Sequence, residues 1–243
     1  MRLALVLLSF NEIDGVRALL PSLVDVSALG VDEVFAVDGG SSDGTLEEYA
    51  RRGVRVVQQR SRGRGEAMRL ACVESSADAL VFFSPDGNED WHDIPKFRAH
   101  LEAGADLVIA SRMMPGAHNE EDTGVFRPRK WANLAFNQAA NTLFGRGLLG
   151  AGQRISDSIN GFRAIRRDRF SALQIDAVGY TVEYQMTIRA LQAGLRIVEF
   201  PTTEGARIGG ETKAPSIPTG LRFVRCLAQE AARTARMRLT GHA

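Results

Sequence analysis

The feature that most constrains the fold is a series of short, mostly apolar runs in the first 112 residues, separated by segments with helical spacing. The runs lie at residues 3–8, 34–37, 55–58, 80–83 and 106–110. Brief runs of bulky residues are typical of strands that helices bury on both faces. Strands and helices that alternate with short connections predict a mostly parallel sheet with right-handed crossovers. We therefore expect an α/β protein with a Rossmann-like N-terminal half.

Polar side chains gather directly after the fourth run, within the stretch from Ala79 to Pro95. Ser84, Asp86 and Asn88 offer hard oxygen donors, which suit Mg²⁺ or Mn²⁺ and do not suit a soft metal. In open α/β sheets, ligands bind at the carboxyl ends of the parallel strands. The sequence therefore predicts a metal or ligand site at this strand end.

Two more strand ends carry residues that suit a nucleotide. The loop DGGSSDGT begins at Asp38, and its glycines, hydroxyls and amides can bind polar ligand groups. A loop that only caps the next helix explains it equally well. The loop after residues 55–58 holds Arg60, Arg62 and Arg64 among glycines, which suits a diphosphate at a helix entrance. A solvated basic loop is the alternative there.

Composition narrows the class of protein. Hydrophobic residues make up 44% of the chain and charged residues 24%, which is typical of a soluble globular protein. The formal net charge of +1 gives no overall reason to expect nucleic acid. Cys72 and Cys226 have no metal-ligand spacing, so we expect buried thiols in a reducing compartment. The N-terminal run is too short for a signal peptide, and no run is long enough to span a membrane.

The second half of the chain departs from simple alternation. Residues 113–129 are polar and irregular, which indicates a functional loop or lid. We expect the following elements there: a helix from Trp131 to Leu143, a strand from Phe162 to Ile165, a helix from Gly179 to Ala193 and a strand from Arg196 to Phe200. The tail, residues 219–243, has helical apolar spacing and holds five arginines against one acid. Such a helix can lie on an anionic membrane, although packing on the domain or on a second subunit is as consistent.

The order of these motifs carries more information than any one of them. The chain reads LLSFNE, AVDGGSSDGT, RGRGEAMR, FFSPDGNEDWHDIP, ASR, INGFRA and RIGGETK in succession. This series resembles the inverting GT-A fold glycosyltransferases, and within them the dolichol-phosphate mannose synthase-like branch. The resemblance implies a single catalytic domain over residues 1–218, with a nucleotide-binding half (1–112) and an acceptor-side half (113–218). The basic amphipathic helix, residues 219–243, would follow it.

The resemblance also implies a set of site residues. Those expected to hold the nucleotide and its diphosphate are Ser9, Asn11, Glu12, Asp38, Gly39, Ser41, Arg64, Ser84 and Asp86. Those expected to hold Mg²⁺ or Mn²⁺ are Ser84, Asp86 and Asn88. Ser84 stands where the family has the first acid of its Asp-Xaa-Asp motif, and an uncharged oxygen there should weaken metal binding. Phe10 and Gly39 replace a common tyrosine and a common acid, which leaves the base and the sugar open.

The expected chemistry follows from charge. Negative charge grows on the diphosphate as it leaves the sugar, and a metal ion with Arg64 and Arg112 can stabilise it. Asp86 is therefore placed in the catalytic machinery. A lipid phosphate acceptor is already largely ionised near neutral pH and needs no strong base. An acceptor hydroxyl would need a carboxylate, for which Asp157 and Glu183 are the candidates. The basic residues expected to bind an anionic acceptor are Arg127, Arg129, Arg207 and Lys213.

These expectations define one leading hypothesis and two alternatives. The leading hypothesis is a metal-dependent enzyme that moves a sugar from a GDP- or UDP-linked donor to a polyprenyl phosphate. It would be cytoplasmic, with peripheral contact at the inner face of the membrane and no nucleic-acid partner; a homodimer stays open. The first alternative keeps the donor chemistry and uses a soluble hydroxyl acceptor. The second is a non-catalytic sugar-nucleotide sensor, suggested by the missing carboxylate at Ser84.

Overall fold

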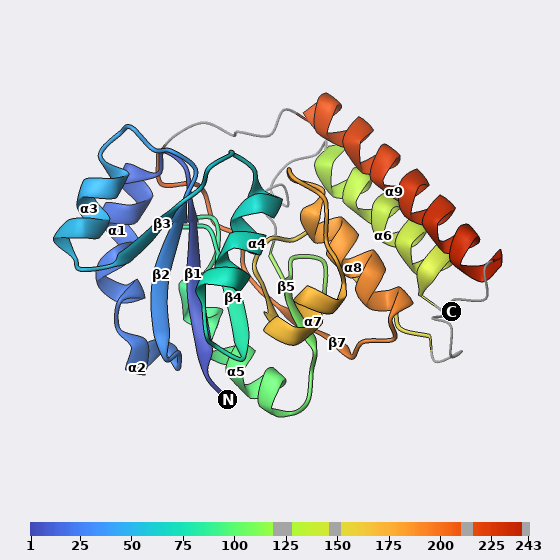
Figure 1. Cartoon of the computed structure of the whole chain (residues 1–243), viewed down its shortest axis with the longest axis horizontal. Coiled ribbons are helices and arrows are strands. Elements are labelled where there is room, and N and C mark those ends of the chain that lie inside the picture. The colour runs from blue at the N-terminus through green and yellow to red at the C-terminus, as the bar shows by residue number, and fades with distance from the viewer. Residues whose placement is uncertain (119–127, 146–151, 210–215, 240–243) are drawn as a thin grey trace.

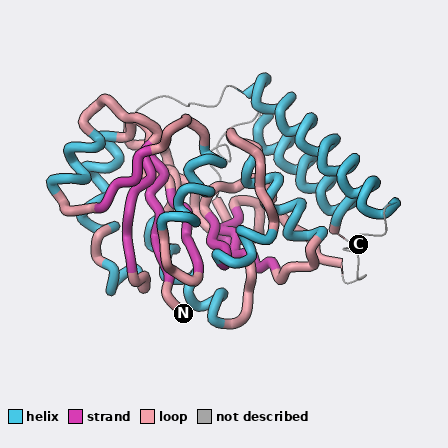
Figure 2. Tube along the Cα trace, viewed as in Figure 1, coloured by secondary structure: helices cyan, strands magenta, loops and turns pink. Residues whose placement is uncertain are grey.

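A computed structural model describes residues 1–118, 128–145, 152–209 and 216–239. One mixed sheet of seven strands lies between layers of helices (Figure 2). The strands are β1 (Leu3–Ser9), β2 (Glu33–Asp38), β3 (Arg55–Gln58), β4 (Ala79–Phe83), β5 (Leu107–Ser111), β6 (Arg163–Arg166) and β7 (Ile197–Pro201). The helices are α1 (Ile13–Leu23), α2 (Val26–Leu29), α3 (Thr45–Arg51), α4 (Arg64–Glu74), α5 (Ile94–Glu102), α6 (Pro128–Phe144), α7 (Arg167–Ala172), α8 (Val182–Gln192) and α9 (Ser216–Leu239), with a 3₁₀ turn, η1 (Trp91–Asp93).

The sheet has the strand order β3-β2-β1-β4-β6-β5-β7. Its first four strands are parallel, and β5 pairs in parallel with β7. Strand β6 is antiparallel to both of its neighbours, β4 and β5. The expected mostly parallel sheet is therefore confirmed, with β6 as the exception. Because β1 to β4 run in the same direction, their carboxyl ends meet at one edge, and this edge carries all the motifs of the N-terminal half.

Two apolar cores pack against the two faces of the sheet. On one face, helices α1, α2, α3 and α5 cover side chains such as Leu5 and Val81. On the other face, α4, α7 and α8 cover side chains such as Val6 and Phe82. Odd and even positions of β1 thus enter different cores, as expected for a strand buried on both sides. The two cysteines are buried and unbonded, as the sequence indicated.

Helices α6 and α9 lie side by side at the edge of the domain, and both pack on α8 (Figure 1). Their outward faces are unusually apolar. Trp131 and Leu134 on α6 are 53% and 49% exposed, and Leu221 and Val224 on α9 are 68% and 55% exposed. The inward faces instead carry Asn133, Asn137, Phe223 and Cys226. Both helices begin at the same end of the molecule (Figure 1), so these apolar side chains lie toward that end.

Among the described helices, none combines the length and the apolar character that crossing a membrane requires.

Candidate active site

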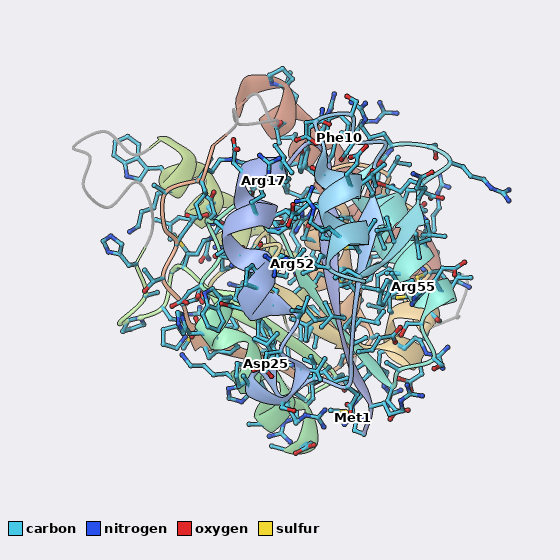
Figure 3. All side chains as sticks on the ribbon, turned by 90° about the vertical axis from the view of Figure 1, so that its left-hand side faces the viewer. Met1, Phe10, Arg17, Asp25, Arg52 and Arg55 are labelled. Carbon is cyan, nitrogen blue, oxygen red and sulfur yellow. The ribbon has the colours of Figure 1, made fainter. Side chains whose placement is uncertain are left out.

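A cavity of about 430 Å³ lies at the carboxyl ends of β1 to β4. Phe10 follows β1 at this end, and Met1 lies at the opposite end of the molecule (Figure 3). Of the residues predicted from sequence, Ser9, Glu12, Gly39, Arg64, Ser84, Asp86 and Arg207 line this cavity. Gln59, Tyr180 and Arg222 also line it, although no sequence motif pointed to them. We call it the strand-end cavity.

The loops after β1 and β2 are joined by the other predicted nucleotide residues. Asn11 donates its backbone N–H to Ser41 Oγ (2.8 Å), and its Oδ1 accepts from the Ser42 N–H (2.9 Å). Asp38 is fully buried, and its Oδ1 accepts from the N–H groups of Gly40 (2.8 Å) and Ser41 (2.7 Å). The carboxylate of Asp38 therefore holds the loop in shape. Asn11, Asp38 and Ser41 are not among the described residues that line the cavity.

Phe10 and Arg62 stack on each other beside the loops that follow β1 and β2. The guanidinium of Arg62 lies over the ring of Phe10, 3.7 Å from its centroid. Gln59 donates to the carbonyl of Gly63 (2.9 Å), which fixes the turn that leads into α4. Arg62, Phe10 and Gln59 all line the strand-end cavity. The outer face of such a stacked pair can take a planar group such as a nucleobase.

Arg64, the first residue of α4, spans the floor of the cavity. Its Nε donates to Oε1 of Glu183 at the start of α8, and its Nη1 donates to Ser84 Oγ (3.0 Å). Burial alone would lower the pKa of Arg64, but the charges of Glu183, Glu89 and Asp86, together with the Glu183 hydrogen bond, outweigh it and raise that pKa. Gly65 allows the start of α4 to lie against the segment that precedes α8, because a Cβ at Gly65 would lie 1.9 Å from the Ala177 carbonyl oxygen. Arg64 is thus a permanently charged group held between two elements.

The predicted metal residues follow β4 as a compact loop. Asp86 is 8% exposed, and its Oδ1 accepts from the Asn88 N–H (3.0 Å). Asn88 Oδ1 is buried and has no hydrogen-bond partner among the described residues. This amide oxygen is therefore available to bind a metal ion or a hydrogen-bond donor of a ligand. No group of three or more carboxylate, imidazole or thiol side chains in the described part of the chain could hold a metal ion. One carboxylate and an amide oxygen still fit Mg²⁺ or Mn²⁺, because Mg²⁺ commonly binds one or two carboxylates together with substrate phosphates.

Glu89 follows Asn88 in the same loop. Its Oε2 accepts from the backbone N–H of Ser84 (2.7 Å), the position that lacks the expected acid. Burial raises the pKa of the Glu89 carboxyl to about 8, against the opposing charge of Arg64. Glu89 therefore supports the loop through the backbone of Ser84.

Arg112 and Asp157 form a second charged pair, outside the described lining of the strand-end cavity. Asp157 is fully buried and accepts from the Arg112 N–H (3.1 Å), Nε (2.8 Å) and Nη2 (3.1 Å). Asn133 on α6 donates a further hydrogen bond to Asp157 (3.1 Å). Burial raises the pKa of Asp157, but the Arg112 charge and these hydrogen bonds outweigh it and lower that pKa overall. The pair therefore joins the end of β5 to α6.

The predicted acceptor residues divide into two groups. Arg207, after β7, points its guanidinium into the strand-end cavity and pairs with Glu12 and Asp86. Arg207 therefore lies among the residues predicted to hold the nucleotide and its diphosphate. Arg127 and Lys213 lie outside the described residues, and Arg129 is described only as part of helix α6. The expected lid over residues 113–129 likewise lies mostly outside them.

A mostly parallel sheet with a cavity of about 430 Å³ at its strand ends, lined by arginines and by the carboxylates of Glu12 and Asp86, agrees with the expected GT-A fold. The family model for glycosyl transferase family 2 matches residues 5–173, and the chain belongs to that family. The protein is therefore a glycosyltransferase, and the fold predicted from its motifs is confirmed.

The chain is also similar to individual proteins of known name. It is 31% identical to the undecaprenyl-phosphate mannosyltransferase of Micrococcus luteus, over 88% of this chain and 87% of that one. It is 28% identical to glycosyltransferase AglJ of Haloferax volcanii over 83% of this chain, and it spans only 62% of that protein. Among solved structures, it is similar to glucosyl-3-phosphoglycerate synthase of Mycobacterium tuberculosis in complex with Mn²⁺, UDP-glucose and glycerol 3-phosphate. That likeness has a TM-score of 0.70 at 21% identity and covers 95% of this chain and 80% of the other.

Proposed function

We propose that the protein transfers a sugar from a nucleoside diphosphate sugar to a polyprenyl phosphate at a membrane surface. The observation that carries the choice of acceptor is the state of the two candidate bases. Glu183 is bound by Arg64, and Asp157 is buried beneath Arg112. Neither carboxylate is placed to deprotonate a hydroxyl, whereas a phosphate acceptor, with a second pKa of about 6, needs no such base. The name of the Micrococcus luteus relative supports the same acceptor class.

The residues of the cavity have separate roles in this reaction. The Phe10–Arg62 surface would hold the nucleobase, and Arg64 and Arg207 would face the diphosphate. Asp86 and Asn88 would hold Mg²⁺ or Mn²⁺, which would supply positive charge for the departing diphosphate. Arg64 is held rigidly by Glu183, so its charge needs no reorganisation while the bond to the sugar breaks. This arrangement stabilises the transition state more than the ground state.

Donor binding gives the first test. A screen of GDP, UDP and dTDP sugars with and without Mn²⁺ should find one nucleotide that raises the melting temperature by about 5–10 °C. At a hundredfold excess over Kd, binding adds about 2.7 kcal/mol, and each kcal/mol shifts the melting temperature of a chain this size by about 2–4 °C. With that donor, labelled sugar should pass to a polyprenyl phosphate and not to the neutral polyprenol. Transfer to a soluble hydroxyl acceptor alone would contradict the proposed acceptor, and donor binding without any transfer would favour a sensor.

Membrane contact is proposed from the outward faces of α6 and α9. Trp131, Leu134, Leu221 and Val224 are exposed at one end of these helices, and the exposed Arg222 and Arg225 lie beside the last two on α9. Arg222 also lines the strand-end cavity, so this end of α9 adjoins the site. Apolar side chains flanked by cations are typical of helices that lie in an anionic bilayer surface. An acceptor held in that bilayer would reach the cavity from this side.

Replacing Leu221 and Val224 together with glutamate should lower binding to vesicles of anionic lipid by at least about tenfold, measured by cosedimentation. The reason is the loss of apolar burial, worth up to about 1.5–3 kcal/mol for a fully buried side chain, together with the added negative charge. The matched control is Val73→Glu, because Val73 is 79% exposed and belongs to a different helix, α4. Equal binding by the double variant and the control would contradict a membrane role for α9.

A further inference from the structure

Arg207 occupies the carboxylate that the proposed metal would need. Its Nη1 lies 2.8 Å from Asp86 Oδ2, and its Nη2 donates to both carboxylate oxygens of Glu12, at 3.0 and 3.1 Å. All three side chains are largely buried, with 22% of Arg207, 11% of Asp86 and 10% of Glu12 exposed. The pairing brings together the end of β1, the loop after β4 and the loop after β7.

Both oxygens of Asp86 are therefore already engaged. Oδ1 accepts from the Asn88 N–H, and Oδ2 faces the guanidinium of Arg207. A divalent cation on the same carboxylate would lie within a few ångströms of the guanidinium, and like charges at that separation repel strongly inside a protein. The charge of Arg207 and a metal ion thus compete for Asp86. Ser84 increases this competition, because its hydroxyl contributes no negative charge that would attract the metal.

The backbone around Arg207 is fixed, whereas its side chain is not fully bonded. The N–H of Gly205 donates to the Asn88 carbonyl (2.8 Å), and the N–H of Ile208 donates to the Asp86 carbonyl (2.7 Å). Arg207 Nε is buried and has no hydrogen-bond partner among the described residues. A guanidinium with an unused buried donor gains by turning toward a further acceptor oxygen, such as one on a phosphate. The loop can therefore stay in place while the side chain changes partner.

We infer that Arg207 acts as an internal cation that keeps a divalent metal off Asp86 until a nucleotide diphosphate draws the guanidinium away. The diphosphate offers Arg207 more negative charge than Asp86 does, and Asp86 then becomes available to the metal. Because binding linkage is reciprocal, the metal must strengthen diphosphate binding by the same factor. This inference rests on the proposed use of a metal at Asp86, and it makes metal binding conditional on the donor.

Mn²⁺ binding by the full-length protein, followed by electron paramagnetic resonance of the free ion, tests this directly. Without nucleotide, Arg207→Gln should bind Mn²⁺ roughly tenfold more tightly than the unmodified protein, within the usual range of coupling between sites. With saturating UDP or GDP, both proteins should gain Mn²⁺ affinity from the diphosphate oxygens, and the unmodified protein should gain roughly tenfold more than Arg207→Gln, after the Mn²⁺ bound by nucleotide alone is subtracted. The matched control is Arg222→Gln, which removes a charge from the same cavity and no contact with Asp86, and its Mn²⁺ affinity without nucleotide should be unchanged.

Arg207→Lys gives a second variant that keeps the charge, so it should bind Mn²⁺ as weakly as the unmodified protein. Equal Mn²⁺ affinity for the unmodified protein and Arg207→Gln, or an equal gain in Arg222→Gln, would overturn the inference while leaving donor binding intact. If nucleotide binds and no protein binds Mn²⁺ with or without it, the proposed metal use fails and the inference fails with it. If no nucleotide binds at all, the proposed function itself is wrong.

Discussion

Asp86→Asn is expected to lower kcat/KM for sugar transfer by about a thousandfold while leaving the protein folded. The substitution keeps the shape of the side chain and removes the carboxylate that we propose holds the metal. Charge stabilisation by a metal or by fixed donors is worth several kcal/mol in the transition state, and removing a single fixed donor commonly costs a hundred- to a thousandfold. The measurement is transfer of labelled sugar at saturating Mn²⁺, with the free energy of unfolding measured in urea.

The control for this variant comes from the same loop. Asp90→Asn changes a more exposed carboxylate that accepts from the His92 N–H (3.1 Å) and does not line the described strand-end cavity. It should leave kcat/KM within about twofold. Loss of the Asp86 charge from this largely buried pair should cost Asp86→Asn about 1–3 kcal/mol of stability, and the protein should stay folded because Arg207 keeps its pair with Glu12. Activity within tenfold of the unmodified protein would remove Asp86 from the mechanism.

The strands were predictable because each is a short apolar run with a clear end. The run at residues 80–83 became β4 (Ala79–Phe83), and the run at 55–58 became β3 (Arg55–Gln58) without any change of boundary. The place of β6 was not predictable. Its run from Phe162 to Ile165 indicated a strand, but periodicity carries no information about neighbours or direction, and β6 enters the sheet antiparallel between β4 and β5.

Helical spacing on α6 and α9 identified the helices but not the side that faces the protein. Trp131 and Leu221 belong to apolar stripes that a globular domain would ordinarily bury, and here both are exposed. The inward side of α6 carries Asn133 and Asn137, which satisfy buried polar groups on Asp157 and Ser158. A stripe of apolar residues therefore indicates a face that needs an apolar partner, and that partner need not be the domain's own core.

The lining of the strand-end cavity was predictable where its residues are close in sequence, as with Ser84 and Asp86. It was not predictable where charged partners come from distant segments. Arg64 pairs with Glu183, 119 positions away, and nothing in either local sequence indicates the other. The same is true of Arg207 and Asp86, which meet because the backbones of their two loops are hydrogen-bonded to each other. Local sequence motifs predict which polar side chains lie at the strand ends. Only the three-dimensional fold determines which opposite charges pair with them.

Arg112→Ala is expected to lower the free energy of unfolding by about 3–5 kcal/mol at pH 7. The variant leaves Asp157, which is fully buried, without the cation that offsets its charge, and breaking a buried pair from one side commonly costs this much. Urea unfolding followed by circular dichroism measures the difference. The matched control is Arg169→Ala, because the Arg169–Asp106 pair is more exposed, and its loss should cost less than about 1 kcal/mol.

The dependence on pH identifies the charge of Asp157 as the cause. In the unmodified protein the pKa of Asp157 is lowered, so its stabilising contribution is present above the usual aspartate pKa of about 4 and is lost as the pH falls through the folded-state value. In Arg112→Ala, burial without the Arg112 charge raises that pKa, so the folded variant takes up a proton as the pH falls. The difference in stability should therefore shrink between pH 7 and pH 5. Arg112→Ala with Asp157→Asn should recover part of the loss at pH 7, and a difference that stays constant with pH would show that lost packing is responsible.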